Sequence, residues 1–247
     1  MTSHGDSLST RAPLEGLAEL LIERLPPEPW APWPGGWPDQ IELAVLDAVF
    51  SIRARYGKRK EEGKAATGVH RVLDNWRTHR ATSDPDDLNA LARFADVPGE
   101  LVGILRSNSK TAGQPKAEVA AEVAYRFTSG DGLRVRHAAQ FPGAGEDQQY
   151  LRNRWVSTRG LGPVTWSYLC MLLGHPDVKA DVMITRYLHR ELNLSRAPTP
   201  EEARMIVTEA AKRLEMSSLD LDHAIWSFER TAAHRQELAG PLANRRN

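Results

Sequence analysis

Apolar residues recur at helical spacing along most of the chain, and no segment shows the strict alternation that is typical of a half-buried strand. Proline and acidic residues precede several of these segments, as in Ser83-Asp84-Pro85-Asp86-Asp87, and such residues favour the first turn of a helix. The pattern predicts an all-α fold. Its longer helices are expected over residues 13–25, 39–56, 67–79, 98–107, 115–127, 147–158, 164–173, 182–192, 199–214 and 219–238.

Residues 26–38 break this pattern, because they hold six prolines and three tryptophans. Such a segment can form neither a regular helix nor a central strand. We expect an extended strap whose indole rings, those of Trp30, Trp33 and Trp37, pack onto the body of the protein. Anchoring through these rings is the simpler role, and an aromatic platform for nucleic-acid bases is the alternative.

Residues 147–174 combine a helix end, a turn with two glycines and a new helix start. Gly160 and Gly162 permit backbone angles that a side chain would resist, and Pro163 suits the first position of a helix. Amide groups at such a helix start can bind a phosphate, because the helix dipole adds to their hydrogen bonds. A Gly-x-Gly alone is a weak signal, and the two flanking helices strengthen it.

Asp181 stands seventeen residues after Val164 and is expected to cap a helix over residues 182–192. One helix followed by a tight return through Gly174-His175-Pro176 would bring its carboxylate back near the two-glycine hairpin. An Asp in this place is ordinarily only a helix cap. Its position after the hairpin suggests a chemical role as well.

Composition sets bounds on the possible partners and cofactors of the 247-residue chain. Lys and Arg number 32, as do Asp and Glu, so a nucleic acid would have to bind locally clustered bases. No run of eighteen apolar residues suggests a membrane span. The single cysteine, Cys170, excludes an internal disulfide and fits a reducing cytoplasm. The bases nearest the hairpin and Asp181 are Arg152, Arg154, Arg159, Lys179 and Arg186.

The run from Arg159 to Thr165, the helix after it, Gly174-His175-Pro176 and Asp181 together resemble the helix-hairpin-helix superfamily of DNA glycosylases. That superfamily includes endonuclease III, adenine glycosylase and 3-methyladenine glycosylase II. Its pattern is Leu-Pro-Gly-Val-Gly, a helix, Gly-x-Pro, and an Asp that follows a Val. The Leu-Pro opening is replaced here by Thr158-Arg159. Upstream, residues 110–125 are more weakly similar to the family's Ser-Lys-Ala helix.

The resemblance implies a two-lobed helical fold with the hairpin and Asp181 at a cleft between the lobes. A central bundle, residues 57–180, would contain the helix-hairpin-helix at 147–174. The N-terminal helices and strap, residues 1–56, would pack with residues 181–247 to form the other lobe.

The resemblance also implies a monomeric, cytoplasmic enzyme of the nucleoid that excises a damaged or modified base from double-stranded DNA. Members with lyase activity carry a Lys two residues beyond the second glycine, where this chain has Val164, so a monofunctional glycosylase is expected. With Cys170 as the only cysteine, the family's four-cysteine iron–sulfur site is absent, and we expect no cofactor.

In such a reaction positive charge develops on the sugar, and a carboxylate beside it stabilises that charge and can activate water. Asp181 is the candidate for this catalytic role. An extruded base also needs apolar and aromatic walls, for which Tyr56, Trp76, Trp166 and Tyr168 are candidates, most of them expected to be core residues. The residues expected to contact DNA are Arg159, Gly160, Leu161, Gly162, Val164, Thr165, Lys179 and Arg186.

Two other functions stay open at this stage. A non-catalytic DNA-binding protein could keep the hairpin fold, and the missing Lys and the balanced charge favour it. An interaction module whose tryptophans face a protein partner is the third possibility. Metal chemistry is disfavoured, since His70 and His79 lie nine residues apart and do not share one helix face.

Overall fold

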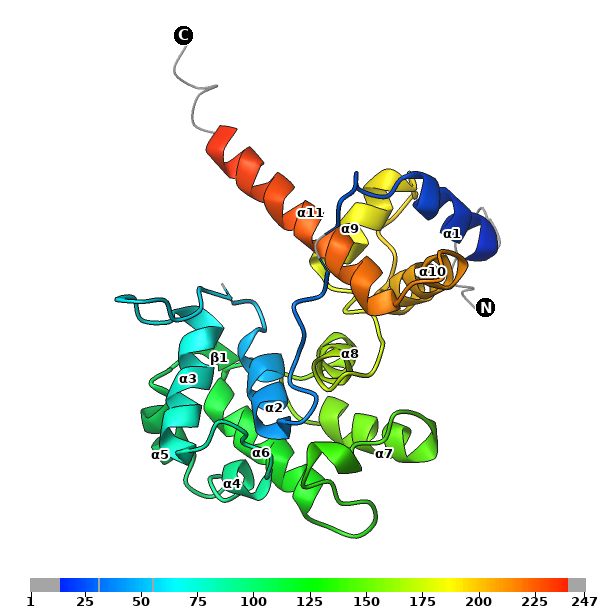
Figure 1. Ribbon diagram of the computed structural model, residues 1–247. Helices are drawn as coiled ribbons and strands as arrows, with labels where there is room; N and C mark the ends of the chain where they lie inside the picture. Colours follow the sequence, from blue (N-terminus) through cyan, green and yellow to red (C-terminus); the bar gives the residue numbers. More distant parts are fainter. Residues whose placement is uncertain (1–13, 31, 55, 240–247) are drawn as a thin grey trace, which may run out of the picture. The chain divides into compact units, whose positions relative to one another are not determined.

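The computed structural model describes residues 14–30, 32–54 and 56–239, with side chains placed as far as residue 231. Both ends of the chain, and the expectations that fall on them, lie outside the described residues. The part described contains eleven α-helices, one short 3-10 helix and one two-stranded sheet (Figure 1). The predicted all-α fold is thereby confirmed. No helix in this part is long and apolar enough to cross a membrane.

The chain divides into two compact units. Unit 1 combines residues 1–34 with residues 176–247, and unit 2 is the continuous segment 35–175. The sequence-based division placed residues 1–56 with the C-terminal helices. In the structure, residues 35–56 belong to unit 2 instead. The apolar helix within them is surrounded by other helices of that unit.

That helix, α2 (Ile41–Phe50), forms the centre of unit 2, and every residue in it is buried. It packs against α3 (Gly68–Arg80), α6 (Lys116–Thr128) and α8 (Pro163–Leu172) (Figure 1). Its sequence leaves hardly any polar face, and a helix that is apolar all round is stable only when neighbours surround it. The unit is completed by α4 (Asn89–Ala92), α5 (Pro98–Leu105), the 3-10 helix Ala138–Gln140 and α7 (Gly145–Val156).

Glu42 is a buried acid on α2 that ties three parts of unit 2 together. It accepts hydrogen bonds from Trp76 Nε1 at 2.7 Å, Arg80 Nε at 2.9 Å and the Asp87 backbone N–H at 2.8 Å. Burial raises the pKa of Glu42, while the hydrogen bonds and the Arg80 charge oppose this shift. The carboxyl is tolerated in the core because its oxygens are satisfied.

Lys116 performs a similar role at the other end of α2. Its Nζ donates to Phe50 O at 2.9 Å and to Ile52 O at 2.6 Å, which satisfies carbonyls at the C-terminus of α2. Burial lowers the pKa of this side chain. The amine is therefore committed to holding the helix end.

A small β-hairpin precedes α6 and was not predicted from the sequence. Strands β1 (Lys110–Thr111) and β2 (Gln114–Pro115) pair antiparallel. Ala112 and Gly113 join them with φ of 49° and 86°, as a tight hairpin turn requires. Two-residue strands are too short to produce a visible alternation.

Unit 1 is a bundle of α1 (Leu14–Glu23), α9 (Val182–Glu191), α10 (Pro200–Arg213) and α11 (Ser218–Ala239). Helix α1 packs against α10, and α9 packs against α11. These helices lie where the sequence predicts them, with ends that differ by a few residues. Their shared core includes Leu21, Ile184, Tyr187, Val207 and Ile225.

The start of α10 yields a prediction on stability in acid. Thr199 and Glu202 form reciprocal cap hydrogen bonds, and Arg196 grips the Glu202 carboxylate at 2.8 and 2.9 Å. The Arg196 hydrogen bond, aided by those from Thr199, lowers the pKa of Glu202 from 4.5 to about 2. Its stabilisation is therefore present above pH 4.5 and is lost as the pH falls through about 2.

Glu202→Gln should remove this contribution. We expect urea unfolding to show a smaller loss of stability in the variant than in the wild type between about pH 5 and about pH 2.5. Glu201→Gln is the matched control, since Glu201 is exposed at the next position. An equal acid loss in the wild type and Glu202→Gln would contradict the assignment.

Candidate functional site

The predicted two-glycine hairpin joins α7 to α8 in unit 2. Leu161 donates its backbone N–H to Thr158 O at 3.1 Å, and its buried side chain anchors the turn. Gly160 has φ of +91°, a conformation that favours glycine. Gly162 is extended and caps α8, and Pro163 is the first residue of that helix. Helix, hairpin and helix thus form where the sequence predicts them.

The Thr165 hydroxyl fixes the hairpin from inside. It accepts hydrogen bonds from Gly162 N and from Trp155 Nε1, both at 2.9 Å, and donates to Gly162 O at 2.8 Å. The hydroxyl is therefore committed to the turn. What the start of α8 offers a ligand is the backbone N–H of Val164 and of Thr165, which have no acceptor among the described residues.

The β1–β2 hairpin lies beside the two-glycine hairpin. Thr111 donates its Oγ1 to Gly160 O at 3.3 Å, and the exposed Arg159 reaches to the side of Gly113. A Cβ on Gly160 would lie 2.8 Å from Thr111 Cγ2, whereas a Cβ on Gly162 would meet nothing. The two glycines therefore differ: Gly160 is required by the fold and Gly162 is not.

Asp181 caps α9 in unit 1, as predicted. Its Oδ1 accepts from the backbone N–H of Met183 at 2.8 Å and of Ile184 at 3.5 Å. Its Oδ2 has no hydrogen-bond partner among the described residues, and the side chain is half-buried. One oxygen thus holds the helix while the other remains available. The unit boundary falls after His175, so the hairpin belongs to unit 2 and Asp181 to unit 1.

The basic residues near the hairpin and Asp181 differ in the ion pairs and hydrogen bonds that their side chains make within the protein. Arg186 and Arg190 share the buried Glu229, with N–O distances of 2.9 and 2.6 Å. The charge of Arg186 is thus partly balanced, which sequence reasoning missed because Glu229 lies 43 residues away. Arg154 donates to Ser129 O at 2.7 Å and serves the fold.

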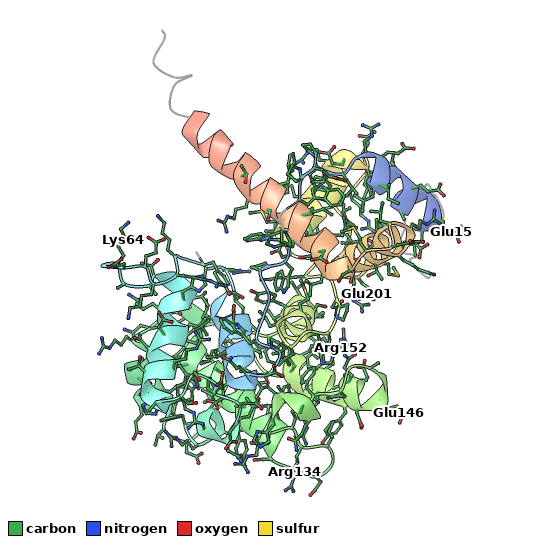
Figure 2. All side chains as sticks on the ribbon, in the orientation of Figure 1. Glu15, Lys64, Arg134, Glu146, Arg152 and Glu201 are labelled. Atoms are coloured by element: carbon green, nitrogen blue, oxygen red, sulfur yellow. The ribbon has the colours of Figure 1, made fainter. Side chains whose placement is uncertain are left out.

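Three other bases lie at partly or fully exposed positions. Lys179 is half-buried in the turn before Asp181 and interacts with the buried Asp222. Arg152 is half-exposed on α7, and Figure 2 labels it. Lys64 lies in the charged loop before α3, where Glu61 and Lys64 pair through their backbones and both side chains are exposed (Figure 2). That loop behaves as a solvated turn.

Three of the four base-pocket candidates, Trp76, Trp166 and Tyr168, are core residues in the structure, which agrees with the expectation that most of them would be. Trp76 is fully buried, and it stacks on His79 while its Nε1 donates to Glu42. Trp166 is buried against Phe141 and Trp155. Aromatic side chains at helical spacing pack into cores more often than they line sites, and the sequence alone could not separate the two uses.

Tyr168 and the fourth candidate, the half-buried Tyr56, converge on the fully buried Asp47. Tyr168 OH donates to Asp47 Oδ1 at 3.3 Å; Oδ2 accepts from Tyr56 OH and, at 2.9 Å, from Trp37 Nε1. Burial and the Asp47 charge raise the pKa of both phenols, so they remain donors at neutral pH. The sequence analysis did not name Asp47, although an acid inside the most apolar helix is a visible signal, and it named Trp37 only as an anchor of the strap.

Within the described chain, no group of three or more His, Cys, Asp or Glu side chains could hold a metal ion.

Comparison with known proteins gives a fold and a family. No curated protein matches the sequence. The crystal structure of H. pylori 3-methyladenine DNA glycosylase (MagIII) bound to 1,N6-ethenoadenine is similar, with a TM-score of 0.53 and 16% identity. The likeness covers 90% of this chain and 96% of that one, and at this identity it establishes the fold alone. A family model described as a domain of unknown function (DUF8548) matches residues 16–230, and the chain belongs to that family.

Proposed function

We propose that this protein is a monofunctional DNA glycosylase, which cleaves the bond between a damaged or modified base and its deoxyribose in double-stranded DNA. The observation that carries the proposal is Asp181, which caps α9 with one oxygen and keeps the other available. It follows a helix-hairpin-helix in a chain whose fold is that of a DNA glycosylase.

Asp181 would act on the sugar. As the C1′–N bond breaks, its electrons leave with the base and positive charge develops on the sugar ring. An ionised carboxylate beside the ring stabilises this charge, and it can accept a proton from the water whose oxygen forms the new bond to C1′. Oδ2, which has no hydrogen-bond partner among the described residues, suits this role, because using it leaves the cap at Oδ1 intact.

The hairpin would grip one strand. The N–H groups of Val164 and Thr165 at the start of α8 suit a phosphate oxygen, and the exposed Arg159 adds positive charge. Lys179 and Arg186 would add further phosphate contacts. These contacts fix the position of the strand and carry no sequence information.

Tyr56 is the candidate side chain for the extruded base. It is half-buried, its ring meets that of His70 edge-on at 4.8 Å, and its hydroxyl is anchored on Asp47. A ring held in this way can present an apolar face without moving. Tyr168, which is buried, would support it from α8.

The assignment as a monofunctional glycosylase depends on whether a lysine amine is available as a nucleophile. Val164 stands where lyases of the resembling family carry a Lys, and Lys116 is buried with its Nζ on two backbone carbonyls. Borohydride trapping of a protein–DNA adduct would contradict the assignment, since it requires an amine nucleophile.

Incubation with duplexes that each carry an alkylated, a deaminated or an oxidised base tests the proposal. Alkali then cleaves any abasic site that the protein has made. Strand cleavage for at least one lesion class by the wild type is the expected result. Binding to every duplex without base release would overturn it in favour of a non-catalytic DNA-binding protein.

The two glycines of the hairpin provide a matched pair for DNA binding. Gly162→Ala should lower the unfolding free energy by less than about 1 kcal/mol, because Gly162 is an extended N-cap residue and a Cβ there meets nothing within 4 Å. We expect it to weaken duplex binding about three- to tenfold in fluorescence anisotropy, because the methyl group obstructs the approach of a phosphate to the α8 amides. Gly160→Ala should instead destabilise unit 2 by about 1 kcal/mol or more. Unchanged binding by Gly162→Ala would remove the hairpin from the DNA interface.

A further inference from the structure

Asp222, on α11, is a buried acid that the proposed mechanism does not use. Its side chain is 4% exposed, and its Oδ1 has no hydrogen-bond partner among the described residues. The carboxyl accepts a hydrogen bond from the backbone N–H of Lys179. A buried carboxylate with an oxygen left unsatisfied is costly, so the group requires an explanation.

The segment that Asp222 holds is the turn leading to Asp181. Val178 and Ala180 are buried in the core of unit 1, so alternate residues of the turn face inward. Asp177 Oδ1 accepts from Val178 N at 2.8 Å and from Arg204 Nε at 2.5 Å, which fixes the beginning of the turn. Asp222 fixes its middle through Lys179. Contacts thus hold the turn from Asp177 up to Asp181, where the cap of α9 begins.

The charges around Asp222 decide its protonation. Burial raises the pKa of Asp222 well above its usual range, the nearby charge of Asp181 raises it further, and Lys179 acts in the opposite direction. Asp177 adds a smaller increase. Helices α9 and α10 also pack against α11. The cations that they present, Arg186, Arg190 and Arg204, pair with Glu229 or Asp177.

We propose that Asp222 is a positioning residue that holds the turn before Asp181 and that, because it is buried with one oxygen unpaired among the described residues, it carries a proton and no charge. The proposal rests on the proposed function. A neutral acid can accept the Lys179 N–H with its carbonyl oxygen. Because it carries no charge, it adds no second negative charge beside Asp181, the carboxylate proposed to stabilise the sugar cation.

Carbon-13 NMR of aspartate carboxyls tests the protonation without any substrate. The Asp222 signal, assigned by its absence in Asp222→Asn, is expected to titrate at a higher pH than the signals of the exposed aspartates. In Asp181→Asn its titration midpoint should move to lower pH, because the neighbouring charge is gone. The proposal would be overturned if Asp222 titrates in the same pH range as the exposed aspartates, or if its midpoint is the same in Asp181→Asn and the wild type.

Base release tests the positioning. Asp222→Asn is neutral and still accepts the Lys179 N–H, so its kcat should stay within about threefold of the wild type at pH 7. Asp222→Leu cannot accept that bond, and its kcat should fall more than about tenfold with KM unchanged. Equal kcat for the two variants would refute positioning. Absence of base release by the wild type would refute the proposed function instead, and the NMR titration would still decide whether Asp222 is protonated.

Discussion

Asp47→Ala is expected to lower the free energy of unfolding by about 3–5 kcal/mol, among the largest effects of any single substitution in unit 2. The Asp47 carboxylate is fully buried and accepts hydrogen bonds from Trp37 Nε1, Tyr56 OH and Tyr168 OH. Alanine would leave these donors without their acceptor, and each buried donor left unsatisfied costs about 1–3 kcal/mol. Urea unfolding followed by circular dichroism and tryptophan fluorescence measures the loss.

Two further variants make this result specific. Asp96→Ala removes an exposed acid of the same unit and should change stability by less than about 0.5 kcal/mol. Asp47→Asn keeps one acceptor oxygen and should fall between Asp47→Ala and the wild type. A loss of less than about 1 kcal/mol in Asp47→Ala would mean that the three donors find other partners, and the cluster would not be a structural centre of unit 2.

This cluster also shows why the sequence predicted the helices better than their polar contacts. Helix starts, the two-glycine hairpin and the Asp181 cap depend on residues within one turn of each other, so local spacing predicts them. Tyr168 and Asp47 are 121 residues apart, and Arg186 and Glu229 are 43 apart. No local pattern indicates which distant acid a side chain will meet.

The placement of α2 illustrates a second limit. Its apolar residues predict a buried helix, and α2 is buried along its whole length. The same residues do not say which helices cover it, because a uniformly apolar surface has no preferred partner. Only its packing on α3, α6 and α8 shows that α2 belongs to unit 2. For the same reason Trp76 and Trp166 could be named as pocket candidates although both are core residues.

The helix cap and the proposed chemistry of Asp181 are compatible because they use different oxygens. Oδ1 receives the two backbone N–H groups of α9, and these bonds orient the carboxylate before any substrate arrives. A group held in this way needs little reorganisation when charge develops beside it. Helix capping by Asp181 thus supports its proposed catalytic role. A substitution that preserves only the cap can separate the two roles.

Asp181→Asn preserves only the cap. Asparagine caps helices about as well as aspartate, so the unfolding free energy should change by less than about 0.5 kcal/mol. Base release should fall at least about 100-fold in kcat, because a neutral amide can neither stabilise the sugar cation nor accept a proton from water. Single-turnover measurement of abasic-site formation on the lesion duplex that the wild type cleaves gives this number, and anisotropy with the same duplex should show that binding persists.

Thr199→Ala is the matched control, since Thr199 caps α10 in the same unit and has no proposed role in the reaction. It should cost about 1 kcal/mol of stability and leave base release unchanged. Asp181→Ala should show both losses, because it removes the cap and the charge together. If Asp181→Asn instead releases the base at the wild-type rate while Asp181→Ala is merely less stable, Asp181 is a helix cap and the carboxylate of the reaction must be sought elsewhere in the chain.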